Sequence, residues 1–335
     1  MIVITGATGH LGNVLTRQFL EQGLKPKVLC CPKDRCASLH GLGVEPDEVD
    51  LQKHDALARA FEGAHTVFHL AAYIRLFPGS ENRMHAVNVK GTRNVIQACR
   101  TCGVKRLVYV STSHVLGSPK QGSVITEAQP IEPRNLAPGY IQSKAIATLE
   151  VQDAIQQGLD AVIAFPSGLL GPHNFGPSHM GRMCVEAATS GRRFYVDGGY
   201  DFVDVRDVAT ALRKLASVGN QGASYLLTGT YLSDHRALEI VYDAIGWHPV
   251  LFRLPNALAR PLASFNVGWR RLFARPNTLF TPQAVAEVLS GARFSSKKAQ
   301  QDLGFSPRPP EESLRDMMQW FKDASMISRV SNISI

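Results

Sequence analysis

A tyrosine and a lysine four positions apart, Tyr140-Ile-Gln-Ser-Lys144, are the residues whose types and spacing most directly suggest chemistry. They lie in a stretch of helical pattern that opens after Pro138-Gly139. Positions i and i+4 share one helix face, so the phenol and the ammonium would lie side by side. A free phenol has a pKa of about 10, but a neighbouring positive charge stabilises its phenolate. The pair therefore predicts a general acid/base acting on a substrate oxygen; a surface pair on an amphipathic helix is the alternative.

Three hydroxyl residues follow the strand-like segment upstream of this helix. The apolar run over residues 105–110 leads directly into Ser111-Thr112-Ser113-His114. Open α/β sheets bind their ligands at the carboxyl ends of parallel strands. One of the hydroxyls could donate a hydrogen bond to a substrate oxygen, whereas a Ser/Thr turn cap would account for at least two of the three.

A glycine-rich turn, Thr5-Gly6-Ala-Thr-Gly9-His-Leu-Gly12, separates a short apolar β-branched run from a helical pattern. Gly6 would permit the tight turn, Gly9 a close approach of the backbone to a pyrophosphate, and Gly12 close packing of helix on strand. The free N–H groups and the dipole of a helix N-terminus favour negative charge there. The turn predicts dinucleotide binding, against the alternative of a loop that needs only glycine conformations.

The end of the second predicted strand bears on the choice of dinucleotide. The acid expected about 20 residues after the glycines is absent, and the chain reads Cys30-Cys31-Pro32-Lys33-Asp34-Arg35. Asp34 follows the proline, which is late for a residue that binds the ribose. Lys33 and Arg35 could bind a 2′-phosphate, which favours NADP over NAD, or they could form a solvated charged turn.

These residues require elements that position them, and the first half of the chain alternates strand and helix patterns. That rhythm is typical of a parallel sheet with right-handed crossovers, so we predict an α/β Rossmann doubly wound fold. Strands are predicted over residues 1–5, 26–31, 44–49, 66–70, 105–110 and 160–165, and helices over 11–20, 55–61, 81–102 and 139–157.

The rhythm breaks after about residue 168. We therefore predict a dinucleotide-binding domain over residues 1–168 and a smaller, mostly helical, mainly substrate-binding lobe over 169–335, with some segments returning to the sheet. Helices are predicted over 207–218, 234–245, 257–273, 282–289 and 311–324, and a strand over 223–227.

The composition indicates a globular protein and gives no sign of a nucleic-acid or membrane partner. The 335 residues are 44% hydrophobic and 19% charged, enough to build a sizeable core. The net charge of +8 comes from scattered basic residues, which an anionic cofactor explains better than nucleic acid does. No apolar run approaches the ~20 residues of a membrane span. We expect no signal peptide, a cytoplasmic protein, and neither nucleic acid nor membrane as a partner.

The cysteines predict neither disulfides nor a metal site. Cys99-x-x-Cys102 lacks a second pair and falls late in a helical pattern, which favours ordinary thiols. The six cysteines are Cys30, Cys31, Cys36, Cys99, Cys102 and Cys184.

Several ordered motifs resemble those of the extended short-chain dehydrogenase/reductases, and they span nearly the whole chain. The similarity is greatest to a branch that includes dihydroflavonol reductases, 3β-hydroxysteroid dehydrogenases and sugar epimerases. The motifs are TGATGHLG, HLAA at 69–72, NVKGTRN at 88–94, VYVSTS at 108–113, YxxxK, PSGLLGP at 166–172, DFVDVRDV at 201–208 and LGFSPRP at 303–309.

The resemblance implies a role for each matching position. Counting back from Gly117, Thr112 matches the family's catalytic serine, with Ser113 as competitor, beside Tyr140 and Lys144. Asn88 would support the central helix. The implied cofactor contacts are Thr8, Gly9, His10 and Leu11 to pyrophosphate, Asp50 and Leu51 to adenine, Leu70, Ala71 and Ala72 to the ribose and phosphate side, and Pro166, Ser167 and Gly168 to nicotinamide.

Three positions depart from the family's pattern. Cys31 stands where the reductase branch often has arginine, which weakens the preference for NADP. Tyr200 replaces the arginine with which nucleotide-sugar enzymes bind substrate pyrophosphate, and Phe165 also replaces an arginine common in relatives. Because tyrosine cannot supply the charge of arginine, these changes favour a less charged substrate.

Other residues could contact substrate or simply pack. His114, His173 and His179 are candidates, as are the aromatic residues Tyr73, Phe77 and Phe175. The amphipathic stretch that contains Trp269 could cover the pocket or meet a partner, with a membrane surface as a further alternative.

Our first hypothesis is an NADP-dependent reductase or dehydrogenase of a small or medium apolar carbonyl or alcohol, with NAD possible. An epimerase that uses the cofactor transiently is the second, and a non-catalytic dinucleotide-binding scaffold the third. By analogy, a homodimer is possible.

Overall fold

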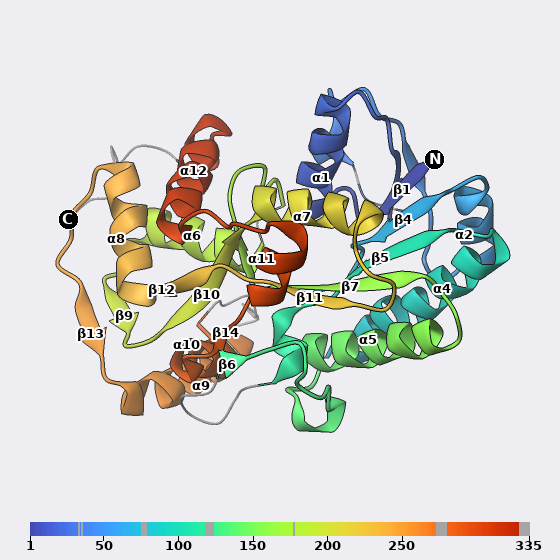
Figure 1. The fold of residues 1–335 in the computed structure, drawn as a ribbon. Helices are drawn as coiled ribbons and strands as arrows, with labels where there is room; N and C mark the ends of the chain where they lie inside the picture. Colours follow the sequence, from blue (N-terminus) through green and yellow to red (C-terminus); the bar gives the residue numbers. More distant parts are fainter. Residues whose placement is uncertain are drawn as a thin grey trace. The chain divides into compact units, whose positions relative to one another are not determined.

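The computed structural model describes residues 1–32, 34, 36–74, 79–117, 124–176, 178–272 and 280–327 (Figure 1). The chain forms two compact units, each built from several segments. The first comprises Met1–Ser167, Val205–Thr228 and Phe294–Ser306, and the second comprises Gly168–Asp204, Gly229–Arg293 and Pro307–Ile335.

The first unit is built on a seven-stranded parallel sheet in the order β11-β7-β5-β4-β1-β2-β3. After β3 the chain crosses to the other side of β1, so the strand order reverses between β1 and β4. Ligands of doubly wound sheets bind at the carboxyl ends of the strands at such a point. The strands are β1 Ile2–Thr5, β2 Lys27–Cys30, β3 Pro46–Glu48, β4 Thr66–His69, β5 Arg106–Val110, β7 Ala161–Pro166 and β11 Ser224–Leu227.

Helices cover both faces of this sheet (Figure 1). Helices α1 and α7 pack together on one face, and α2, α4 and α5 pack in sequence on the other. Every residue of β4 and β7 is buried, as expected for strands covered on both faces. The helices are α1 His10–Glu21, α2 His54–Phe61, α3 Glu81–Met84, α4 Gly91–Thr101, α5 Tyr140–Gln156, α7 Val205–Ser217 and α11 Lys297–Leu303.

The predicted α/β fold with a doubly wound parallel sheet is confirmed. One predicted helix differs in detail, because residues 81–102 form α3, a π-helical segment at His85–Lys90 and then α4. A π-helical turn shifts the hydrogen-bond pattern by one residue, and hydrophobic spacing gives no signal for such a shift.

The second unit has a three-stranded sheet in the order β12-β10-β8 and a two-stranded pair of β13 with β9. Its core includes Phe202 of β10, Tyr242 of α8, and Met317 and Phe321 of α12. The elements are β8 Gly168–Leu170, α6 His179–Ser190, β9 Phe194–Val196, β10 Gly199–Asp204, β12 Thr230–Ser233, α8 Asp234–Ile245, β13 Phe252–Leu254, α9 Asn256–Leu272, α10 Pro282–Ser290 and α12 Pro310–Asp323.

The helical spacing predicted α8 at its observed bounds, and α7, α10 and α12 within two residues. The short strands of the second unit and α6 were not predicted, because strands of three or four residues are too short to show a period. Two short strands, β6 Val124–Ile125 and β14 Arg293–Phe294, complete the elements.

Two expectations concern membrane spans and metals. No helix in the described ranges has both the length and the apolar character to cross a membrane. Among the same residues, no group of three or more His, Cys, Asp or Glu side chains is arranged to hold a metal ion.

Candidate active site

The glycine turn links β1 to α1, and packing makes two of its glycines necessary. Gly6 has a φ of 74°, and a Cβ there would lie 2.7 Å from the Cα of Ala71. A Cβ on Gly12 would lie 2.2 Å from the carbonyl oxygen of Gly6. Gly9 is the N-cap of α1 and has no side chain to satisfy the first N–H groups of the helix. The turn therefore presents free amides at a helix start, as a bound phosphate would require.

A fully buried histidine, His69, connects this turn to the helix segment that follows β4. Thr5 and His69 are register neighbours on β1 and β4, and Thr5 Oγ1 lies 2.8 Å from His69 Nδ1. His69 Nε2 lies 3.1 Å from Thr92 Oγ1, and Thr92 donates its own proton to the Asn88 carbonyl. Thr92 must therefore accept from His69, which fixes the neutral Nε2–H tautomer. Burial and the nearby Lys144 charge lower the pKa of His69 to about 3.

The side chain of Asn88 continues this series of hydrogen bonds to α5, which carries Tyr140 and Lys144. Its Oδ1 accepts from the Tyr73 N–H at 2.7 Å, and its Nδ2 donates to the Ser143 hydroxyl at 2.9 Å. Ser143 in turn donates to the Tyr140 carbonyl oxygen at 2.7 Å. Asn88 thus supports the start of α5, as the family resemblance implied, and connects it through His69 to the glycine turn.

The three hydroxyls after β5 have different surroundings. Ser111 Oγ lies 2.7 Å from Thr148 Oγ1 and ties β5 to α5. Thr112 Oγ1 lies 2.8 Å from His114 Nδ1, and burial lowers the pKa of His114 to about 4. Ser113 is fully buried, and its hydroxyl has no hydrogen-bond partner in the part of the chain that the structure describes.

Tyr140 and Lys144 lie on the first turns of α5. Lys144 is 3% exposed, donates from Nζ to the Val110 carbonyl at 2.8 Å, and lies 4.3 Å from the centroid of the Tyr109 ring. Burial lowers the pKa of Lys144 to about 7 and raises the pKa of Tyr140 to about 12. Because Lys144 hydrogen-bonds the last residue of β5, the YxxxK helix is held directly against the strand that leads into Thr112.

Three further residues expected to contact the dinucleotide are Ser167, Ala71 and Leu11. The Ser167 hydroxyl is buried and has no partner among the described residues, so it could donate to a bound polar group. The Ala71 N–H donates to Thr5 Oγ1 at 3.3 Å, which holds the end of β4 against the glycine turn. The side chain of Leu11 is buried, so only its backbone is available to a phosphate.

Sequence reasoning set Asp34 aside, but the structure brings it to the glycine turn. Thr8 Oγ1 donates to Asp34 Oδ2 at 2.5 Å, and Asp34 Oδ1 accepts from the Cys36 N–H at 3.1 Å. The distance of Asp34 from β2 along the chain gave no signal that its segment folds back. Lys33 and Arg35, from which the NADP preference was drawn, lie outside the described residues.

The residues expected to contact the adenosine side and the nicotinamide also form hydrogen bonds or packing contacts within the protein. Asp50 Oδ1 accepts from the Gln52 N–H at 2.9 Å, and the Leu51 carbonyl accepts from Asn94 at 2.8 Å. Leu70 donates from its backbone to the Thr5 carbonyl at 3.2 Å. A Cβ on Gly168 would lie 2.6 Å from the Phe202 ring, so packing alone requires that glycine.

Several side chains singled out in the sequence pack inside their own units. Phe165 is buried in β7, and Tyr200 lies against Phe202 with ring centroids 5.3 Å apart. His173 stacks on Phe175 at 6.2 Å within the second unit. Burial lowers the pKa of His179 to about 4. Phe77 lies outside the described residues.

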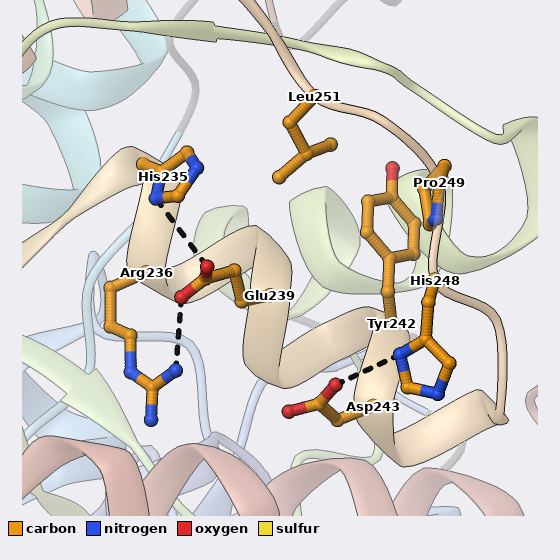
Figure 2. A pocket seen from close by; sticks show the side chains of 8 residues that line it. All are labelled: His235, Arg236, Glu239, Tyr242, Asp243, His248, Pro249 and Leu251. Carbon is orange, nitrogen blue, oxygen red and sulfur yellow. Dashed lines mark hydrogen bonds and ion pairs between the residues drawn. The ribbon is translucent and has the colours of Figure 1, made fainter.

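A surface hollow along α8 contains none of these candidates. Figure 2 shows that its charged side chains pair with one another, with Arg236 2.9 Å from Glu239 and His248 3.2 Å from Asp243. The lining residues of the hollow are His235, Arg236, Glu239, Tyr242, Asp243, His248, Pro249 and Leu251.

Comparisons with known proteins show the family of the chain and agree with its fold. A model of the "NAD dependent epimerase/dehydratase family" matches residues 2–227. The chain is 31% identical to sterol demethylase protein B of Methylococcus capsulatus, with 97% of this chain and 99% of that protein covered. It is 28% identical to a putative dihydroflavonol 4-reductase of Synechocystis, with 96% of this chain and 94% of that protein covered. The solved structure of gox2253 matches with a TM-score of 0.84 at 29% identity, covering 98% of this chain and 99% of that one.

Proposed function

We propose that this chain, which belongs to the NAD dependent epimerase/dehydratase family, reduces a carbonyl group or oxidises an alcohol on a small-to-medium, relatively apolar substrate. The family makes it an NAD(P)-dependent enzyme of the oxidoreductase type. The observation that carries the finer proposal is Tyr140 held beside the end of β5, where Thr112 lies, by the bond from Lys144 to the Val110 carbonyl.

Tyr140 supplies the proton. With its pKa raised to about 12 by burial, Tyr140 is protonated at neutral pH and ready to donate to a substrate oxygen. The opposite direction would require this phenol to lose its proton first.

Lys144 stabilises negative charge on Tyr140, and Thr112 positions the substrate oxygen through a hydrogen bond. The buried Lys144 amine has a pKa near 7, so it carries a positive charge in part at neutral pH and would stabilise negative charge developing on Tyr140. If His114 donates from Nδ1 to Thr112 Oγ1, the Thr112 proton is free to point at the substrate oxygen. Ser113 remains the competing hydroxyl.

The cofactor supplies the hydride when bound. Gly6, Thr8, Gly9, His10, Leu11 and Gly12 would hold its pyrophosphate, with Asp50, Leu51, Leu70, Ala71 and Ala72 toward the adenosine side and Pro166, Ser167 and Gly168 toward the nicotinamide.

We retain NADP(H) as the favoured form on the strength of Lys33 and Arg35. Asp34 opposes it, because a carboxylate beside Thr8 suits a ribose hydroxyl better than a 2′-phosphate.

Two features support an apolar substrate. By the family resemblance, Tyr200 replaces the arginine with which nucleotide-sugar enzymes bind substrate pyrophosphate, and Phe165 replaces an arginine common in relatives, so the chain lacks two positive charges that could bind an anionic substrate. Relatives include a dihydroflavonol 4-reductase and a farnesyl-dihydroquinoline-oxide ketoreductase by name. We assign substrate contacts mainly to residues 169–335.

Epimerisation is the second candidate function, because the matching family model is named for epimerases and dehydratases.

Tyr140→Phe tests the mechanism. Removing the phenolic proton should lower kcat about a hundred- to ten-thousand-fold, while cofactor binding stays near wild type. The measurement is the absorbance of reduced cofactor over a panel of ketones and alcohols, with NADPH and NADH in parallel.

Tyr231→Phe, an exposed tyrosine in β12, is the matched control and should retain full activity. Full activity in Tyr140→Phe would overturn the assignment of the proton donor. Substrate conversion without net cofactor consumption would favour the epimerase.

A further inference from the structure

Helix α9 of the second unit buries two alanines and exposes four large apolar side chains. Ala259 and Ala263 are fully buried and pack with Val196 and Val285. Four large apolar side chains of the same helix face solvent instead. We call them the α9 stripe: Leu258, Leu262, Phe265 and Trp269, which are 52%, 44%, 66% and 55% exposed.

The stripe has the spacing of a continuous helix face. Its members fall at i, i+4, i+7 and i+11, so they lie within one narrow sector along the helix. The rings of Phe265 and Trp269 stack with centroids 5.9 Å apart. Of the thirteen large apolar side chains that are exposed in the described part of the chain, six fall between Val250 and Trp269. Such a concentration marks an interaction surface rather than scattered exposure.

The charge of this region indicates the partner. From residue 244 to residue 286 the sequence contains no aspartate or glutamate, yet it contains Arg253, Arg260, Arg270, Arg271 and Arg275. Asp197 pairs with Arg253 at 2.7 Å, and Arg260 of α9 is exposed. The region is therefore basic and aromatic together.

We propose that the α9 stripe binds the surface of membranes that contain anionic phospholipid, with α9 lying in the plane of the headgroups. Leucine, phenylalanine and tryptophan on one face with arginine elsewhere are typical of interfacial helices. Anionic headgroups complement the arginines. A second copy of the chain would instead bring two acid-free basic regions together, which like-charge repulsion opposes.

This proposal departs from the sequence-based expectation of no membrane partner, and it does not depend on the proposed reaction. It requires surface binding and no membrane span.

Co-sedimentation with anionic vesicles tests this proposal. Full-length protein should bind vesicles of phosphatidylcholine with about a third phosphatidylserine, and binding should weaken with added salt. The double variant Leu262→Gln/Phe265→Gln should bind at least about ten-fold less, since both apolar side chains are lost from the interface. Arg260→Gln should bind less than about two-fold more weakly, because Arg260 falls on the side of α9 opposite the stripe and its charge acts on the anionic surface only at a distance.

Matched controls come from exposed residues of the first unit. Leu24→Gln/Val218→Gln and Arg59→Gln should bind like wild type. All variants should keep their melting temperature, because the side chains are exposed. Wild type that ignores the anionic vesicles, or a stripe variant that binds as wild type does, would overturn the proposal. So would a dimer in sedimentation velocity that Leu262→Gln/Phe265→Gln converts to monomer without any vesicle binding by wild type.

Discussion

At the scale of single residues, the same side-chain type takes different roles because its surroundings differ. Ser111 ties β5 to α5 through Thr148, whereas Thr112 meets His114 and Ser113 is sealed in the interior. A row of hydroxyls in the sequence cannot reveal these partners, since each partner comes from elsewhere in the fold or from the turn geometry. The structure thereby accounts for Ser111 and leaves two candidates for the substrate oxygen.

Asp34 is the residue whose role sequence spacing obscured, and it yields a prediction about cofactor choice. Asp34→Asn removes a negative charge next to Thr8 while keeping an acceptor for its hydroxyl. Removing like-charge repulsion of order 1 kcal/mol should raise the preference for NADPH over NADH by about five- to ten-fold. The ratio of the two cofactor dissociation constants measures it.

Asp55→Asn is the matched control, because this exposed aspartate lies on α2. Equal changes in the affinities for both cofactors would show that Asp34 does not lie near the 2′ position.

At the scale of elements, the hydrogen bonds from Thr5 through His69, Thr92 and Asn88 to Ser143 join β1, β4, the following helical segment and α5. The elements themselves were predictable, because buried strands and amphipathic helices have their own periods. The connection was not, since it depends on which residues become register neighbours. The only sign of this connection in the sequence was a histidine within the apolar strand predicted at 66–70. The spacing of residues did not show which side chains would hydrogen-bond it.

His69→Phe tests whether this connection holds the elements together. Phenylalanine keeps an aromatic ring but removes the hydrogen bonds of Thr5 and Thr92 to His69, while each hydroxyl keeps one other partner. The loss of these two buried hydrogen bonds should lower the free energy of unfolding by about 1–3 kcal/mol, measured by urea denaturation.

His65→Phe serves as control, because His65 is exposed and contacts its neighbour Thr66. It should change the free energy of unfolding by no more than about 0.5 kcal/mol. A loss in His69→Phe as small as that of the control would mean that the connection contributes no stability.

At the scale of the whole molecule, buried ionisable groups make stability depend on pH in two windows. Burial lowers the pKa of His69 to about 3 and of His114 to about 4, from an ordinary value of 6.5. Between these values the unfolded chain binds more protons than the folded one. The free energy of unfolding should therefore fall as pH falls below 6.5, by up to about 1.4 kcal/mol per pH unit for each histidine.

Lys144 defines the second window, and it ties stability to the catalytic arrangement. Its pKa is lowered from 10.5 to about 7 by burial, so above pH 7 the unfolded chain again binds more protons, and Lys144 should make stability rise with pH from 7 towards 9. Above pH 9.0 the buried thiols of Cys30, Cys99 and Cys184, whose pKa values are raised from that value by burial, act in the opposite direction. Lys144→Met removes the group and should flatten this rise. It should keep most of the slope below pH 6.5, because burial is the main cause of the lowered pKa of His69 and the Lys144 charge the smaller one. Urea denaturation at a series of pH values measures both slopes. An unaltered alkaline slope in Lys144→Met would show that Lys144 is charged in the folded protein, and the positive charge beside Tyr140 would then be complete at neutral pH.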